Sequence, residues 1–113
     1  MIQPRLAASV LASGLLRRAE SQGGFGTVLA KGDVTAGSIV LILVERGANP
    51  RILERILGSG GDYAWAESPF LSVSDKEVPA FIARRRRFDP DLWVLELDVP
   101  DAERFAAELG GLD

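Results

Sequence analysis

The chain contains no cysteine and no histidine, and each absence excludes a class of chemistry. Without cysteine there can be no disulfide bond, no thiol nucleophile and no zinc site built on thiolates. Without histidine there can be no histidine-dependent catalytic triad and no metal site that relies on imidazole. We therefore predict no catalytic residues of these types, no cofactor and no metal centre.

The chain also lacks a net positive charge and a long hydrophobic run. Thirteen basic and sixteen acidic residues leave a net charge of -3, so the molecule as a whole does not attract phosphate or an anionic membrane. The apolar segment at residues 6–16 is interrupted by small and polar residues and is too short to span a bilayer. We interpret it as a core-packing helix and expect a cytoplasmic protein that does not bind membranes.

What remains is the composition of one soluble globular domain. A chain of 113 residues is long enough for one hydrophobic core, and 47% hydrophobic with 26% charged residues is ordinary for such a domain. No internal repeat and no linker interrupts the sequence. We predict a single domain over residues 1–113.

Apolar periodicity and turn residues indicate that helices and strands alternate along the chain. A first helix is predicted over residues 4–20, because Pro4 suits a first turn and Gly23 and Gly24 end the segment. Apolar runs bounded by turn residues predict three strands, at residues 25–31, 38–45 and 63–67. The short breaks between them favour an antiparallel meander, in which residues 31–37 form a hairpin loop.

Residues 50–57 carry signals of both a helix and a strand. Asn49, Pro50 and Gly58 are typical of helix termini, but the segment would make only about two helical turns. Because it lies between two predicted strands, we interpret it as a further strand.

A second helix is predicted to begin near Ser74, where Ser74 and Glu77 have the spacing of a capping box. Pro79 conflicts with so early a start, because a proline one turn into a helix removes a backbone hydrogen bond. The helix should end at Asp89 and Pro90, since the residue before a proline is pushed out of the α region.

The rest of the chain is predicted to form a strand and a short helix. Residues 92–99 are apolar on both faces at first and alternate later, which is typical of an inner strand. Asp101 can cap a final helix that turns Ala102, Phe105 and Leu109 inward. The predicted fold is α+β, with a single antiparallel sheet made of the meander and the C-terminal inner strand. An N-terminal helix, a second helix ending in an arginine run and a short C-terminal helix pack on it.

Four consecutive arginines end the second predicted helix. Successive helical residues lie about 100° apart, so the four side chains fan around the helix and cannot grip one phosphate track together. Arg85 falls at the edge of the apolar face, where we expect its guanidinium to meet a carboxylate. Asp89, Pro90, Asp91 and Trp93 follow as a helix-to-strand corner. We predict that Arg85 and these residues have a structural role there.

The candidate binding residues are those left over from this corner. Arg84, Arg86 and Arg87 could contact phosphate, nucleic acid or a protein, and Trp65 could anchor a protein partner or form a half-buried sheet edge. We place Phe88 in the core with Trp93, so the stacking residues of single-strand binders are not expected.

The segment Arg-Phe-Asp-Pro-Asp-Leu-Trp that ends at Trp93 resembles the signature of domain of unknown function family 1491, small uncharacterised proteins of alphaproteobacteria. Gly32-Asp33 before an apolar strand and Tyr63-x-Trp65 are further points of similarity. The resemblance implies a single small α+β domain. It implies no activity, ligand or catalytic residue.

Three functions remain open on these grounds. The first is a non-enzymatic module that binds a protein partner or a second copy of itself, which the missing catalytic residue types and the short strands with unpaired edges favour. The second is nucleic-acid or phosphate binding through the arginine run. The third is an enzyme that uses carboxylates. The carboxylates considered for it are Asp33, Asp62, Glu67, Asp89 and Asp91.

Overall fold

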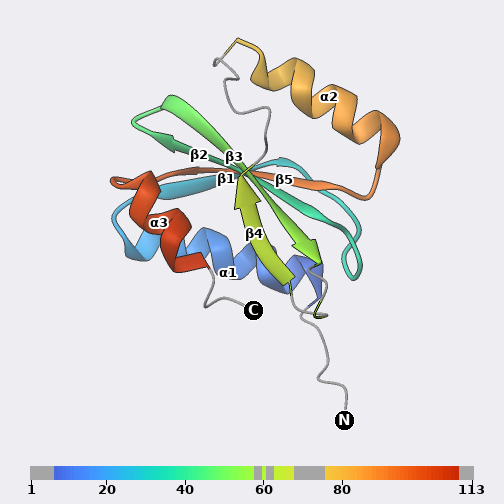
Figure 1. Ribbon diagram of the computed structural model, residues 1–113, viewed down its shortest axis with the longest axis horizontal. Helices are drawn as coiled ribbons and strands as arrows, with labels where there is room; N and C mark the ends of the chain where they lie inside the picture. The colour runs from blue at the N-terminus through green and yellow to red at the C-terminus, as the bar shows by residue number, and fades with distance from the viewer. Residues whose placement is uncertain (1–6, 58–59, 61–62, 68–75, 110–113) are drawn as a thin grey trace.

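The computed structural model describes residues 7–57, 60, 63–67 and 76–109 (Figure 1). Within this part of the chain, helices and strands follow one another in the predicted order. They are α1 (Ala8–Ser21), β1 (Phe25–Ala30), β2 (Ile39–Glu45), β3 (Ala48–Leu57), β4 (Tyr63–Glu67), α2 (Val78–Phe88), β5 (Trp93–Asp98) and α3 (Ala102–Glu108). The strand predicted at residues 50–57 is confirmed as part of β3.

The strands form one open sheet in the order β1-β5-β2-β3-β4. The meander β2-β3-β4 is antiparallel, and β5 is an inner strand, as predicted. Strand β5 pairs with β1 antiparallel and with β2 parallel. The predicted α+β class is therefore confirmed, and the sheet is mostly antiparallel with one parallel pair.

The loop between β1 and β2 is not a hairpin, contrary to the sequence prediction. Strand β5 lies between β1 and β2, so the loop has to cross the end of an intervening strand. Gly32 and Gly37 allow this crossing, because a Cβ atom at either position would collide with the carbonyl oxygen of Asp91. Close backbone approach explains both glycines.

The sheet separates two helical layers (Figure 1). On one face α1 and α3 cover Leu41, Leu43, Leu95 and Leu97, and on the other face α2 covers a second apolar cluster. Strand β2 is buried along almost its whole length because it is covered on both faces, as expected for a central strand. This arrangement leaves β1 and β4 as the two edges of the sheet.

Two helix starts differ from the predictions. Helix α2 begins at Val78, which places Pro79 in the first turn, where the missing amide hydrogen is tolerated. The predicted start at Ser74 lies outside the described residues. Helix α1 begins at Ala8, and the predicted first-turn residue Pro4 also lies outside the described residues. None of the described helices is long and apolar enough to cross a membrane.

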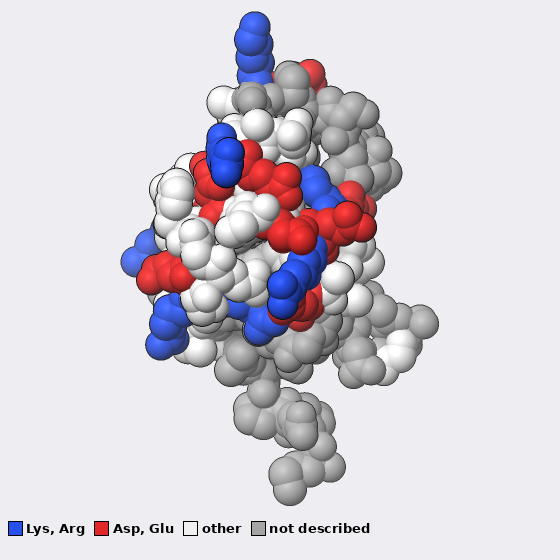
Figure 2. Space-filling view, turned by 90° about the vertical axis from the view of Figure 1, so that its left-hand side faces the viewer, with Lys and Arg blue, Asp and Glu red and all other residues white. Residues whose placement is uncertain are grey.

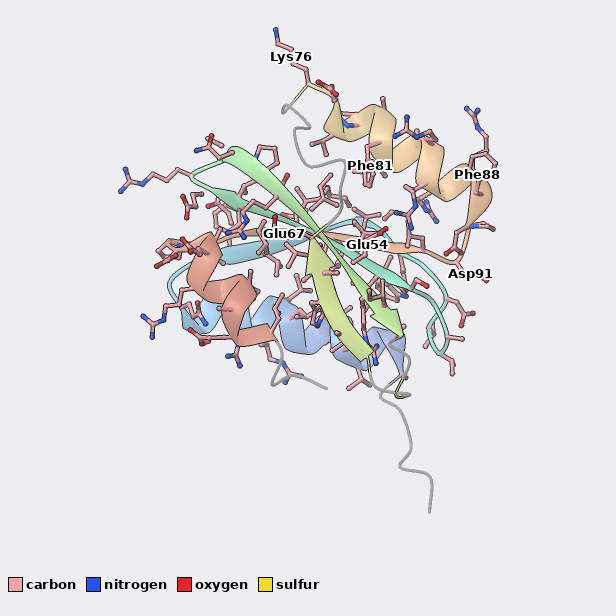
Figure 3. The ribbon with its side chains drawn as sticks, viewed as in Figure 1. Glu54, Glu67, Lys76, Phe81, Phe88 and Asp91 are labelled. Carbon is pink, nitrogen blue, oxygen red and sulfur yellow. The ribbon has the colours of Figure 1, made fainter. Side chains whose placement is uncertain are left out.

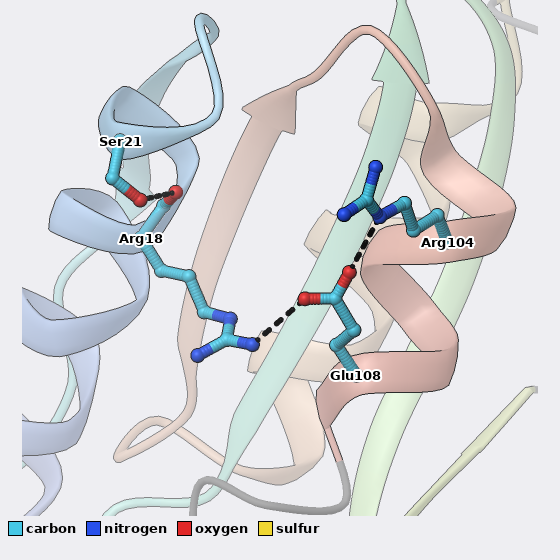
Figure 4. A network of polar contacts seen from close by, with 4 residues as sticks. All are labelled: Arg18, Ser21, Arg104 and Glu108. Carbon is cyan, nitrogen blue, oxygen red and sulfur yellow. Dashed lines mark hydrogen bonds and ion pairs between the residues drawn. The ribbon is translucent and has the colours of Figure 1, made fainter.

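A polar network joins α1 to α3 on their shared face of the sheet (Figure 4). Arg18 donates from Nη2 to Oε2 of Glu108 at 3.1 Å, and Arg104 donates from Nε to Oε1 of the same carboxylate at 2.9 Å. Asp101 caps α3, as predicted, by accepting a hydrogen bond from the backbone N–H of Arg104 at 3.0 Å. Asp101 thus fixes the start of α3, and Glu108 fixes the position of α3 beside α1.

Candidate functional site

The arginines of α2 have different environments, as the helical fan predicts. Arg85 forms an ion pair with Glu54 of β3 and lies over the ring of Phe81, with its guanidinium carbon 5.9 Å from the ring centre (Figure 3). The carboxylate that holds Arg85 is therefore Glu54, far away in the sequence, and not Asp89 or Asp91. This pair ties α2 to the sheet.

Arg86 is occupied by the corner that follows the helix. Its Nη2 donates to the carbonyl oxygens of Lys31 and Pro90, each at 3.2 Å. Asp89 accepts a hydrogen bond from the backbone N–H of Asp91 at 3.2 Å, which closes the turn around Pro90. The corner is thus built by Arg86 on backbone carbonyls, and Arg86 is not available as a free cation.

Arg84 and Arg87 remain exposed, and neither forms a hydrogen bond or an ion pair with any described residue. On the helix Arg87 points away from Val78 and Phe81, the residues of α2 that are buried, whereas Arg84 lies one turn after Phe81 at the border of the exposed side. They are the candidate arginines that the fold does not use.

Phe88 lies on the surface, and its predicted place in the core is wrong. Its side chain is 81% exposed, whereas Phe81 is 5% exposed. Both rings lie on nearly the same side of α2, because seven residues make almost two full turns. Phe88, however, is the last residue of α2, beyond the part of the helix whose residues are buried. The chain then turns at Asp89, and no described element covers the ring.

The two tryptophans lie on the same face of the sheet as α1. Trp93 of β5 is buried, and its Nε1 donates to the carbonyl oxygen of Asp33 at 2.6 Å. Trp65 of the edge strand β4 is partly buried, and its Nε1 has no hydrogen-bond partner among the described residues. Trp93 therefore anchors the loop between β1 and β2.

The predicted carboxylates do not converge. Asp33 accepts from the backbone N–H groups of Thr35 and Ala36 at 3.0 and 2.8 Å, and Glu67 pairs with Arg51. Asp62 lies outside the described residues. Within the described ranges, no cluster of carboxylates is arranged to hold a metal ion.

A cleft of about 640 Å³ opens at the end of the molecule that holds the hairpin between β2 and β3. Its carboxylates already serve the fold, because Asp98 accepts from the N–H of Arg46 and Glu45 accepts from the N–H of Ala102, both at 2.8 Å. Figure 2 views this end, where acidic side chains gather in the middle of the face and basic ones lie around them. The cleft contains none of the predicted site residues.

Strand β1 carries a surface that the sequence patterns did not reveal. Its large apolar side chains Phe25, Val28 and Leu29 are 60%, 42% and 41% exposed. Between Phe25 and Ala30 there is no charged residue. The signal for such a surface is an uncharged apolar run in an edge strand. The sequence shows the run, but only the topology shows that β1 is an edge strand.

Comparisons with known proteins place these features in a family context. The model of the family described as "Protein of unknown function (DUF1491)" matches residues 6–107. A crystal structure of a DUF1491 family protein from Caulobacter crescentus CB15 is 32% identical, with a TM-score of 0.80. The match covers 89% of this chain and 94% of that one.

Two structures determined by other means are also similar. An NMR structure of a DUF1491 family protein from Caulobacter crescentus CB15 has 32% identity, a TM-score of 0.78 and coverage of 91% and 94%. The solution structure of protein Atu0922 from A. tumefaciens has 27% identity, a TM-score of 0.71 and coverage of 90% and 92%. A comparison with curated proteins finds no match.

Proposed function

Because the chain belongs to the DUF1491 family of proteins of unknown function, its role has to be inferred from its surface, and we propose that it is a non-enzymatic, self-associating module. The contact runs along the outer edge of β1, and the partner is a second copy of the chain. The observation that supports this most strongly is an open edge strand that carries exposed apolar side chains and no charge.

Edge strands normally carry features that prevent further pairing, such as lysine, proline or a very short length. Strand β1 has none of these along Phe25–Ala30, and its pairing with β5 is regular from Phe25 to Val28 and shifts in register only between Val28 and Ala30. Its hydrogen-bonded neighbour is β5, and no other described backbone group bonds to it. The opposite edge is different, because β4 ends at a charged residue, Glu67. Of the two edges of the sheet, β1 is therefore the one without a charged side chain.

A second copy fits this edge because the strand can pair with itself around a two-fold axis. An antiparallel pair centred on Thr27 keeps the corresponding faces of the two sheets on the same side. Gly26 of one copy then lies opposite Val28 of the second copy, so a small residue meets a large one within the regular part of the strand. Such a cross-strand pair contributes about 0.2–1 kcal/mol.

Electrostatics favour the β1 edge over the rest of the surface as the place where a second copy binds. Each molecule has a net charge of -3, so two copies repel each other over most of their surfaces. An uncharged strand is where this repulsion is smallest. Since the contact is small compared with obligate interfaces, we expect a reversible dimer whose population rises with concentration.

The test is light scattering over a concentration series with Thr27→Lys and Thr35→Lys. Both threonines are exposed, but Thr27 lies at the proposed two-fold axis and Thr35 lies in the loop between β1 and β2. Lysine at position 27 places two like charges opposite each other, so we expect dimer dissociation constants to rise about tenfold or more. Thr35→Lys should associate like the unmodified chain.

A chain that stays monomeric at all concentrations would refute self-association. A pull-down from a native lysate tests whether the β1 edge binds a different protein. Recovery of a different protein that is lost with Thr27→Lys, from a monomeric chain, would assign the β1 edge to that protein instead of a second copy.

A further inference from the structure

The exposed end of α2 combines two unpaired cations with an unpaired aromatic ring. Arg84 is one turn from Phe88 (i, i+4) and one turn from Arg87 (i, i+3), so Arg84 lies between the two on the surface of the helix. Phe88 is 81% exposed, more than any other large hydrophobic side chain in the described ranges. An exposed phenylalanine next to two arginines that the fold does not use requires a different explanation from a solvated charged face.

The cations of this surface are not neutralised by their own helix. No acidic residue occurs in α2 between Val78 and Phe88. Asp89 follows directly and accepts from the backbone N–H of Asp91, and neither of these acids pairs with Arg84 or Arg87. Lys76 stands at the other end of α2 beside the exposed Glu77 (Figure 3), and the exposed positions between them and Arg84 include Ala80 and Ala83. The basic part of α2 is therefore its C-terminal end, from Arg84 to Phe88.

The surface is also remote from the acidic end of the molecule. Acidic side chains gather at the end shown in Figure 2, whereas Phe88 lies at the opposite end, where α2 turns into β5 (Figure 3). The molecule thus has a net charge of -3 but carries a local basic surface. A polyanion would be attracted to this surface and repelled by the acidic end.

We propose that Arg84, Arg87 and Phe88 form a binding site for single-stranded nucleic acid. The two guanidinium groups would contact successive phosphates, and the Phe88 ring would stack on an unpaired base. Binding of single strands combines these two elements, because cations follow the backbone and every base offers a face for stacking. A duplex is a poorer ligand, since its bases are already stacked and cannot cover the Phe88 ring.

The charge pattern alone would also fit an acidic segment of a protein, but the ring discriminates between the two. Carboxylates gain nothing from Phe88, because the face of an aromatic ring carries partial negative charge. A flat base covers the ring and buries it. The site therefore favours the ligand that supplies both phosphates and ring faces.

The test is fluorescence anisotropy with a labelled short oligodeoxythymidine, measured between about 50 and about 200 mM salt. Two contacts to phosphate predict a slope of about -1.4 in log affinity against log salt, or a loss of about sevenfold over this range. The double variant Arg84→Ala, Arg87→Ala should lose both the binding and the slope. Arg17→Ala removes another exposed arginine that has no described partner, on α1, and should bind like the unmodified chain.

Phe88→Ala separates stacking from charge. It should weaken binding by about fivefold or more at every salt concentration and leave the slope unchanged, since stacking on a base contributes about 1–3 kcal/mol. Unlabelled polyphosphate and polyglutamate lack stacking rings and can pair only with the arginines, so both should compete weakly. Circular dichroism of each variant verifies that the fold is retained.

The proposal would be overturned by an affinity that does not respond to the arginine variants, or by a Phe88→Ala variant that binds as the unmodified chain does. Displacement of the labelled oligonucleotide by polyglutamate as effectively as by the unlabelled oligonucleotide, at equal charge, would instead assign the surface to an acidic polypeptide. None of these outcomes depends on β1, so Thr27→Lys should leave oligonucleotide binding unchanged.

Discussion

At the scale of single residues, the two phenylalanines of α2 have opposite roles. Phe81 fills the apolar cluster between α2 and the sheet, whereas Phe88 projects into solvent. We expect Phe81→Ala to lower the free energy of unfolding by about 3–5 kcal/mol, because a buried aromatic ring leaves a cavity. Phe88→Ala should change it by no more than about 0.5 kcal/mol. Urea unfolding measures both, and a large loss for Phe88→Ala would mean that the ring is buried.

The two tryptophans provide a second matched pair of residues. In Trp93 the indole N–H donates to the carbonyl oxygen of Asp33, whereas in Trp65 it has no partner among the described residues. Phenylalanine at position 93 leaves that carbonyl without its donor, but at position 65 it removes an unsatisfied group. We expect Trp93→Phe to cost about 1–3 kcal/mol more in free energy of unfolding than Trp65→Phe. Equal costs in urea unfolding would contradict the role of the Trp93 hydrogen bond.

At the scale of elements, α2 is held to the sheet mainly by its first half. Its buried residues are Val78 and Phe81, and the ion pair between Arg85 and Glu54 is the polar link that follows them. Arg85→Met keeps the stem over Phe81 but removes the charge. Because the pair is partly exposed, we expect a loss of about 1 kcal/mol, seen as about fivefold faster hydrogen exchange of α2 amides.

Arg84→Met is the control for this experiment, since it changes an arginine of the same helix that has no described partner. Its α2 amides should exchange at the original rate. Equal acceleration in both variants would show that helix propensity, and not the pair with Glu54, determines how firmly α2 is held.

The elements themselves could be predicted from the sequence, but their neighbours in the sheet could not. Residues 50–57 were identified as a strand because they are too short for a stable helix. The insertion of β5 between β1 and β2 had no such signal, because periodicity within a segment says nothing about which strands pair. The loop at residues 31–37 was misinterpreted as a hairpin for this reason.

At the scale of the whole molecule, the candidate surfaces depend on long-range contacts. Helical geometry correctly separated Arg85 from the other arginines, but its partner Glu54 lies in a distant strand and could not be predicted. The sequence predicted Phe88 in the core with Trp93, and only the position of α2 over the sheet reveals its exposure. The open edge at β1 likewise follows from the topology and not from the local sequence.

The central claim is that two copies pair along β1 with Thr27 at the two-fold axis, and the absence of cysteine allows a direct measurement. Thr27→Cys introduces the only thiol, and opposed residues in an antiparallel pair lie at about the Cα separation that a disulfide needs. On mild oxidation we predict a covalent dimer for Thr27→Cys and none for Ala80→Cys, which places a thiol on the exposed side of α2. A Thr27→Cys chain that stays monomeric under oxidation, or that cross-links no faster than Ala80→Cys, would contradict the account.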